Sequence, residues 1–356
     1  MWFVDKSHPK VLVIRKFGEH FSLRLGIKAL GVLLVLLIAC ILLIMLSLSI
    51  GSYQLSVQQV WQVVWGSLPS EHMNTVVWEF RFPRVLVAML VGAMLALSGS
   101  ALQSATGNSL ADPSLVGISQ GAGMAVVLLT VLLPQIVDVW RPWLAFLGAL
   151  SVAAVIQGLS WSRQGKNSIR FVLMGIGVAA FINAITSALM TYGQIDQAMS
   201  ALVWLSGSIN GTDWMDVSLL ATWFMVLLPF ILVLSRSIST LKMGEVTAIS
   251  LGVSLPQLRI GLVCLAVGLA AVATAVVGPL GFIGLIAPHI AQRITHSGTG
   301  LRLLITAVVG ALIVALADLL GRILFEPIQI PAGLMTALIG VPMFIFLIRR
   351  SSTGRA

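Results

Sequence analysis

The stretch GPLGFIGLIAPHIAQR, from Gly278 to Arg293, decides how this chain folds. It lies inside an apolar run, yet it contains three glycines and two prolines. Because proline removes a backbone donor and clashes with the preceding turn, a helix must start, stop or bend here. In hydrocarbon, broken backbone is tolerated only where protein covers it or where it lines a wet cavity. The stretch therefore predicts a bent segment at the centre of a membrane bundle, beside a transport path; a merely kinked structural helix is the alternative.

The composition around this stretch indicates an all-α, polytopic membrane protein. Of 356 residues, 58% are hydrophobic and 9% are charged, whereas soluble domains carry about 25% charged residues. The apolar runs are continuous and too long for the alternating segments of about ten residues that build a β-barrel. No phosphate-binding GxxxxGK[ST] motif occurs, and the histidines and cysteines are scattered, so no ATP site, metal site or other cofactor is predicted in this chain.

Ten apolar runs are long enough, or nearly so, to cross a membrane, which requires about 20 residues. The eighth is the short, bent one, so some of the helices are expected to be discontinuous. Residues 1–28 form a basic N-terminal arm, 29–349 the membrane domain and 350–356 a tail. The expected spans are 29–51, 84–105, 114–134, 143–162, 169–191, 215–235, 258–278, 280–295, 302–325 and 332–348.

The positions of lysine and arginine predict the orientation. With both termini in the cytoplasm and ten spans, most of the 21 basic residues fall on the inner side and most acidic residues fall outside. Basic residues are enriched in cytoplasmic loops, which also explains the net charge of +9 without a nucleic-acid partner. We therefore expect an even number of spans, with the N-terminus and the C-terminus inside.

Two ionisable residues, Asp318 and Arg322, interrupt the ninth span. They are four residues apart, so they share one helix face and can form an ion pair. Charged groups within a span are a functional hypothesis by default. One hypothesis makes Asp318 the proton or sodium site of an ion-coupled secondary transporter, and the alternative is a structural ion pair near the outer interface.

Two further stretches have recognisable patterns. Residues 81–123 begin with RFPR, which starts a helix at the outer face, continue with the small residues Gly92, Ala96 and Gly99 for close helix contact, and then turn at 108–113. The inner loop 241–257, LKMGEVTAISLGVSLPQ, is apolar and long enough for two short helices along the membrane surface. Such an ordered loop suits the docking of a soluble partner better than a plain solvated linker does.

Together these motifs resemble the FecCD family, the permease subunits of binding-protein-dependent ABC importers for ferric siderophores, haem and vitamin B12. The similarity runs from about residue 53 to residue 349 and implies a BtuC-like permease fold. The motifs that carry it are RxPR at 81–84, GxxLAxSG at 92–99, LADP at 110–113, GExxAxxLG at 244–252, GFIGLxxPHxxR at 281–293, Asp318 with Arg322, and PxG at 331–333.

The resemblance implies roles for individual residues. The docking site for a periplasmic binding protein would be Arg81, Arg84 and Arg322. The contact with the ATPase would be made by the loop that contains Gly244, Glu245, Ala248, Leu251 and Gly252. The gate and pathway would comprise Asn108, Leu110, Asp112, Pro113, Gly281, Gly284 and Pro288. The family usually has Asn-Pro at the gate turn, whereas this chain has Asn108-Ser109, which loosens the turn.

The resemblance also implies the partners of the chain. A second permease subunit, either a copy or a paralogue, would complete the path, and two cytoplasmic ABC ATPase subunits would bind ATP and magnesium. This chain would be no enzyme itself but a multi-pass permease of the cytoplasmic (inner) membrane, in contact with lipid. A ferric siderophore is the expected substrate, with haem or vitamin B12 as alternatives.

Overall fold

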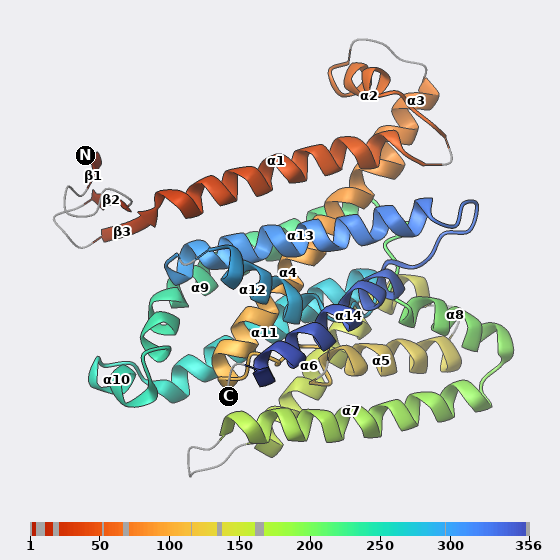
Figure 1. The fold of residues 1–356 in the computed structure, drawn as a ribbon. Helices are drawn as coiled ribbons and strands as arrows, with labels where there is room; N and C mark the ends of the chain where they lie inside the picture. Colours follow the sequence, from red (N-terminus) through yellow and green to blue (C-terminus); the bar gives the residue numbers. More distant parts are fainter. Residues whose placement is uncertain are drawn as a thin grey trace.

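A computed structural model of the chain describes residues 2–4, 11–16, 21–51, 53–66, 71–114, 116–133, 137–160, 167–295 and 297–353. It is a helical bundle with a small sheet at its N-terminus (Figure 1). The elements are β1 (Trp2–Val4), β2 (Val11–Lys16), β3 (Phe21–Gly26), α1 (Ile27–Ser49), α2 (Val57–Val64), α3 (Glu71–Thr75), the π-helical turn η1 (Val76–Arg81), α4 (Phe82–Thr106), α5 (Ile118–Leu132), α6 (Val137–Ser160), α7 (Asn167–Tyr192), α8 (Ile195–Leu205), α9 (Trp214–Leu241), α10 (Glu245–Ser250), α11 (Leu255–Val277), α12 (Ile283–Ile294), α13 (Thr299–Ile323) and α14 (Ala332–Thr353).

Each of the ten expected spans overlaps a helix. Among the described residues, seven helical stretches are long and apolar enough to cross a membrane. The other three are shorter: α5, the apolar part of α14 (Ala332–Phe346), and α12 with 12 residues. The all-helical, multi-pass class is therefore confirmed, whereas the number of crossings and the orientation remain predictions.

The N-terminal arm contains a structure that the sequence analysis did not anticipate. Strands β1, β2 and β3 form an antiparallel sheet in the order β1-β2-β3. Strand β2 is rich in β-branched residues, which favour strands. The sheet lies at the same end of the bundle as α10, while α2, α3 and α8 lie at the opposite end (Figure 1). We call these the inner end and the outer end, after the predicted orientation. Residues 1, 5–10, 17–20 and 354–356 of the predicted arm and tail lie outside the described residues.

Helix α4 is the centre of the bundle, and its glycines allow the close packing. A Cβ atom on Gly99 would lie 2.0 Å from the carbonyl oxygen of Gly284, and one on Gly92 would lie 2.2 Å from that of Gly310. The Ser98 hydroxyl donates a hydrogen bond of 2.5 Å to the Ala266 carbonyl of α11. Small residues at such positions let helix backbones approach in a membrane, where lipid removes most of the hydrophobic drive for helix association. The predicted close contacts of Gly92 and Gly99 are confirmed.

The stretch from Gly278 to Arg293 is a break between two helices and not a kink within one. Helix α11 ends at Val277, and α12 begins at Ile283. Both Gly278 (φ +76°) and Phe282 (φ +69°) have left-handed backbone, which is uncommon for phenylalanine. The backbone N–H of Ser208 donates to the Val277 carbonyl over 2.8 Å, which satisfies one group freed by the break. The prediction of a bent, protein-covered segment is confirmed, and the kinked-helix alternative is wrong.

Candidate functional site

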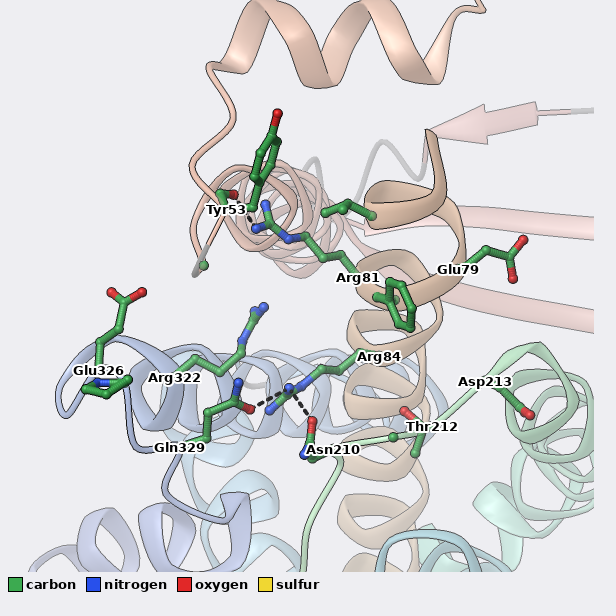
Figure 2. Close-up of a pocket in the computed structure, with 15 residues that line it drawn as sticks. Tyr53, Glu79, Arg81, Arg84, Asn210, Thr212, Asp213, Arg322, Glu326 and Gln329 are labelled. Atoms are coloured by element: carbon green, nitrogen blue, oxygen red, sulfur yellow. Dashed lines mark hydrogen bonds between the residues drawn. The ribbon is translucent and has the colours of Figure 1, made fainter. Parts of the chain in front are cut away.

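The outer end of the bundle contains a cavity of about 510 Å³, which we call the arginine cavity. Its walls are Gly51, Tyr53 and residues from the stretches 76–84, 210–213 and 322–329. All three arginines of the predicted docking site line it, although they come from η1, α4 and α13 (Figure 2). The fold thus brings together three arginines that are up to 241 positions apart in the sequence.

Arg84 is the hub of a polar network in this cavity. Its Nη2 lies 2.8 Å from Oδ1 of Asp318, and its Nε lies 3.1 Å from both carboxylate oxygens. Its Nη1 donates to the side-chain oxygens of Asn210 over 3.1 Å and Gln329 over 3.0 Å (Figure 2). Several charge-assisted hydrogen bonds fix the planar guanidinium in one orientation.

The predicted Asp318–Arg322 pair is present, but it is the longer of the two pairs that Asp318 makes. Nε of Arg322 lies 3.4 Å from Oδ2 of Asp318, and its Nη2 donates to the Ser47 hydroxyl of α1. Asp318 is therefore enclosed by two guanidinium groups and is only 3% exposed. A sodium ion at this carboxylate would face repulsion from both cations, which weighs against an ion-coupling role.

Arg81 is bound to backbone on the neighbouring segment. Its guanidinium donates to the carbonyls of Leu48, at 2.6 Å, Ser49 and Tyr53. The first two carbonyls belong to the last turn of α1, where helix carbonyls lack intrahelical partners, and Tyr53 follows the helix. Arg81 is 7% exposed, so it joins α1 to the start of α4 and reaches the cavity only with part of its side chain.

A π-helical turn contains Arg81 and directly precedes the helix of Arg84. Residues 76–81 form this wider turn directly before α4, and Pro83 follows in the first turn of α4. The helical stretch already begins at Glu71, so the expectation that RFPR starts the helix is wrong. The indole N–H of Trp214 donates to the carbonyl of Trp78 over 2.8 Å, which supports the turn from α9. Such π-turns occur frequently at functional sites. The sequence gives no local sign of this turn, nor of the partners Asn210 and Gln329.

The predicted ATPase contact lies at the inner end and differs in detail from the expectation. The loop contains one short helix, α10, and not two, because α11 already begins at Leu255. Gly244 (φ +112°) and Gly252 (φ +83°) bracket α10 with left-handed backbone, which explains the two glycines of the motif. Ala248 is the buried residue of α10, so its side chain faces the protein and not the solvent.

The outward face of this loop is apolar. Val246 is 80% exposed, and three further apolar side chains of the loop are also exposed: Met243, Ile249 and Leu251. Glu245 forms an ion pair of 2.5 Å with Arg259 of α11, which ties α10 to the bundle. Exposed apolar groups beside a membrane domain are typical of a protein contact, and the sequence motif had singled out only Leu251 among them.

The predicted gate residues separate into an exposed and a buried group. Asn108 and Leu110 are exposed, and the Asn108 side chain accepts a hydrogen bond from the Leu110 backbone N–H over 2.9 Å. Asp112 and Pro113 are buried because the segment folds back into the bundle to reach Gly284 of α12. Gly284 faces Gly99 of α4. Gly99 lies seven residues before the end of α4, so this contact is about 10 Å along the helix axis from that end.

Asp112 connects this segment to the broken helix. Its Oδ1 accepts hydrogen bonds from the backbone N–H of Ser114, over 2.8 Å, and from the Ser114 hydroxyl. Its Oδ2 faces the Leu285 amide in the first turn of α12 and has no hydrogen-bond partner of normal geometry. A carboxylate suits a helix N-terminus. The structure thus brings Asp112, Pro113 and Gly284 together, with Gly281 close to Ser114 and Pro288 inside α12.

Comparisons with known proteins agree with this architecture. Residues 18–350 match the FecCD transport family. The chain is 35% identical over 339 residues to the achromobactin transport system permease protein CbrC of Dickeya dadantii, which covers 95% of this chain and 96% of the relative. It is 37% identical to the ferric enterobactin transport system permease protein FepG of Escherichia coli, over 89% of this chain and 96% of the relative.

A solved structure extends the agreement to the fold. A metal-chelate type ABC transporter in an inward-facing conformation superposes with a TM-score of 0.79 and 27% identity, over 90% of this chain and 99% of the other. The family match begins before residue 53, so it includes all of α1 and part of the N-terminal arm. The chain is a multi-pass protein of the inner membrane and belongs to the FecCD transport family, the permeases of ABC importers.

Proposed function

We propose that this chain is the permease subunit of an ABC importer that moves an iron chelate, most specifically a ferric siderophore, into the cytoplasm. The observation that supports it most is the family membership over nearly the whole chain, with relatives named for ferric enterobactin, Fe(3+)-citrate and siderophore transport. Haem and vitamin B12 stay as the alternative substrates.

The proposal requires partners. A second permease subunit, identical or paralogous, would complete the path, two cytoplasmic ATPases would bind ATP and magnesium, and a periplasmic binding protein would deliver the chelate. In support, the two ends of the bundle present different surfaces: charged groups, three arginines and three carboxylates, at the arginine cavity and apolar groups around α10. These suit an acidic partner outside and a packed partner inside.

The mechanism would be alternating access. A docked binding protein would place carboxylates at Arg81, Arg84 and Arg322, and ATP-driven movement of the ATPases would act on α10 and its glycine-bracketed loop. The break between α11 and α12, together with the Asp112 segment packed against it, would let the half-helix α12 reorient relative to α4. Discontinuous helices serve this purpose in other transporters.

Asp318→Asn distinguishes this proposal from ion-coupled transport. Asp318 competes with any docking carboxylate for Arg84 and Arg322, so removal of its charge should leave ATP-dependent uptake active and tighten binding-protein docking by up to about tenfold. An ion-coupled transporter would lose all uptake. The measurement is uptake of radioactive ferric siderophore into proteoliposomes with the ATPase and binding protein, and, separately, with this chain alone under a proton or sodium gradient.

The matched control is Glu326→Gln, which removes a carboxylate that lines the same cavity but makes no ion pair with the described arginines. It should leave docking affinity within about twofold of the parent, as is usual for a lone rim charge. Accumulation by this chain alone under an ion gradient, abolished in Asp318→Asn, would refute the ABC proposal.

Val246→Asp tests the ATPase contact without touching the fold. Val246 is 80% exposed, so a charge there should be tolerated by the isolated chain. If the apolar face is buried against the ATPase, loss of one buried valine costs about 1.5 kcal/mol, and co-purification of the ATPase should fall about tenfold or more. Binding-protein docking at the other end should stay unchanged. Unaltered stimulated ATP hydrolysis in this variant would contradict the assignment of α10.

A further inference from the structure

A second cavity lies at the inner end, and it shares no lining residue with the arginine cavity. Its volume is about 260 Å³, and it is enclosed by the last turns of α4 and α9, by α12 and by the first turns of α13. Two cationic residues line it: Lys242, directly after α9, and Arg302 of α13. We call it the Lys242 cavity.

The charge in this cavity is not balanced by the protein. No aspartate or glutamate lines it, and neither cation has an ion pair with a described carboxylate. The nearest acidic residue in the sequence, Glu245, is bound to Arg259 instead. Two like charges that face one cavity repel each other, and a bound anion would remove that repulsion.

The hydrogen-bonding groups of the cavity also favour an oxyanion. Arg302 donates through Nη2 to the Thr299 hydroxyl over 3.3 Å, and that hydroxyl also accepts from Ser239 over 2.6 Å. Apart from this bond, neither the Arg302 guanidinium nor the Lys242 ammonium donates a hydrogen bond to another residue that the structure describes. Guanidinium and ammonium groups are the side chains that bind phosphate.

The remaining walls contribute neutral polar groups. Gln103 and Ser104 of α4 and Gln292 of α12 line the cavity. The Gln103 amide nitrogen donates to the Gly284 carbonyl over 3.1 Å, so its oxygen is left as an acceptor. Partial burial, followed by the charge of Arg302, lowers the pKa of Lys242 to about 8, which agrees with a cation that lacks a counter-ion.

We propose that the Lys242 cavity binds a phosphate-type oxyanion between Lys242 and Arg302. The group comes from one of two sources: the headgroup of an anionic phospholipid in the adjacent leaflet, or a free phosphate ion. Because Lys242 lies between α9 and α10 while Arg302 belongs to α13, the bound anion joins the base of the α10 loop to the core of the bundle.

The experiment uses the full chain and two probes. In nanodiscs of phosphatidylcholine, replacement of part of the lipid by phosphatidylglycerol should raise the unfolding midpoint if a headgroup is the source. In nanodiscs of phosphatidylcholine alone, inorganic phosphate should raise the unfolding midpoint if free phosphate is the source. The reference is a chloride buffer of the same ionic strength. Lys242→Gln and Arg302→Gln should each weaken the binding of the effective probe about tenfold, as expected for one charge-assisted hydrogen bond.

The control variant is Arg293→Gln, which removes an exposed cation at the same end that does not line the cavity. It should bind either probe like the parent. Lys242 keeps much of its surface in contact with solvent, and its side chain makes no hydrogen bond with a described residue, so Lys242→Gln should fold normally. The proposal is overturned if both probes bind Lys242→Gln as they bind the parent, or if Arg293→Gln weakens binding as much as Lys242→Gln does. The first of these results is also expected if the true occupant of the cavity is a carboxylate of a partner protein.

A pH series adds a readout that a structural role of Lys242 would not change. The lipid phosphodiester stays singly charged between pH 7 and 9, whereas Lys242, with a pKa of about 8, loses its charge. The groups that face it are Arg302 from α13 and neutral side chains from α4 and α12. Binding of phosphatidylglycerol should therefore weaken as the pH rises through 8, and Lys242→Gln should remove this dependence.

Discussion

Arg84→Glu is expected to abolish binding-protein-dependent uptake. Arg84 makes the shortest ion pair of the arginine cavity with Asp318 and two further hydrogen bonds to Asn210 and Gln329. The substitution would direct a carboxylate toward Asp318 and toward any docking glutamate. Removal of one partner from a close charged pair at an interface costs about 2–5 kcal/mol, so docking affinity should fall at least about thirtyfold. Binding-protein affinity, measured with the purified transporter at low and moderate salt, checks this.

The salt series separates docking from folding. For the parent, docking affinity should decrease as salt rises, because screening shortens the range of the arginine charges. Arg84→Gln removes the charge without adding repulsion, so it should lower the docking affinity less than Arg84→Glu does and should make that affinity less dependent on salt. Arg293→Glu changes an exposed charge at the opposite end and should leave docking unchanged. A properly folded Arg84→Glu chain that binds the partner with parental affinity at low salt would remove the arginine cavity from the docking proposal.

The fold could be predicted largely from the sequence because the membrane imposes few choices. Apolar runs of fixed length and the positions of basic residues are strong one-dimensional signals, and all ten expected spans overlap helices. The break at Gly278 could also be predicted, since proline and glycine act on the local backbone. The N-terminal sheet is not apparent from the basic, polar composition of the arm, although β2 is rich in β-branched residues.

The sequence could name residues for the candidate sites but not the contacts that these residues make. The motifs pointed to Arg81, Arg84 and Arg322, yet nothing in the sequence relates Arg84 to Asp318, because their meeting depends on how α4 packs against α13. The same applies to Asp112, whose contact with α12 follows from a loop that folds back into the bundle.

Gly99→Ala should have the largest effect on stability of any change considered for this chain. The added Cβ would lie 2.0 Å from the Gly284 carbonyl oxygen and 2.3 Å from its Cα, both of which belong to the backbone of α12. Backbone cannot rotate away as a side chain can, so α4 and α12 would have to separate. Overpacking of a filled interior costs about 1–3 kcal/mol and sometimes more, and here we expect about 3 kcal/mol or more. The yield of monodisperse protein and its unfolding midpoint in detergent measure the loss.

Gly177→Ala is the matched control, because Gly177 lies in the interior of α7 and a Cβ there would meet nothing within 4 Å. Alanine is the better helix former by about 0.5–1 kcal/mol, so this variant should be as stable as the parent or slightly more stable. Equal stability of the two alanine variants would mean that α12 moves freely against α4. The half-helix would then need no glycine contact to hold it, and the contact of Asp112 with its first turn would be the stronger candidate for keeping α12 in position.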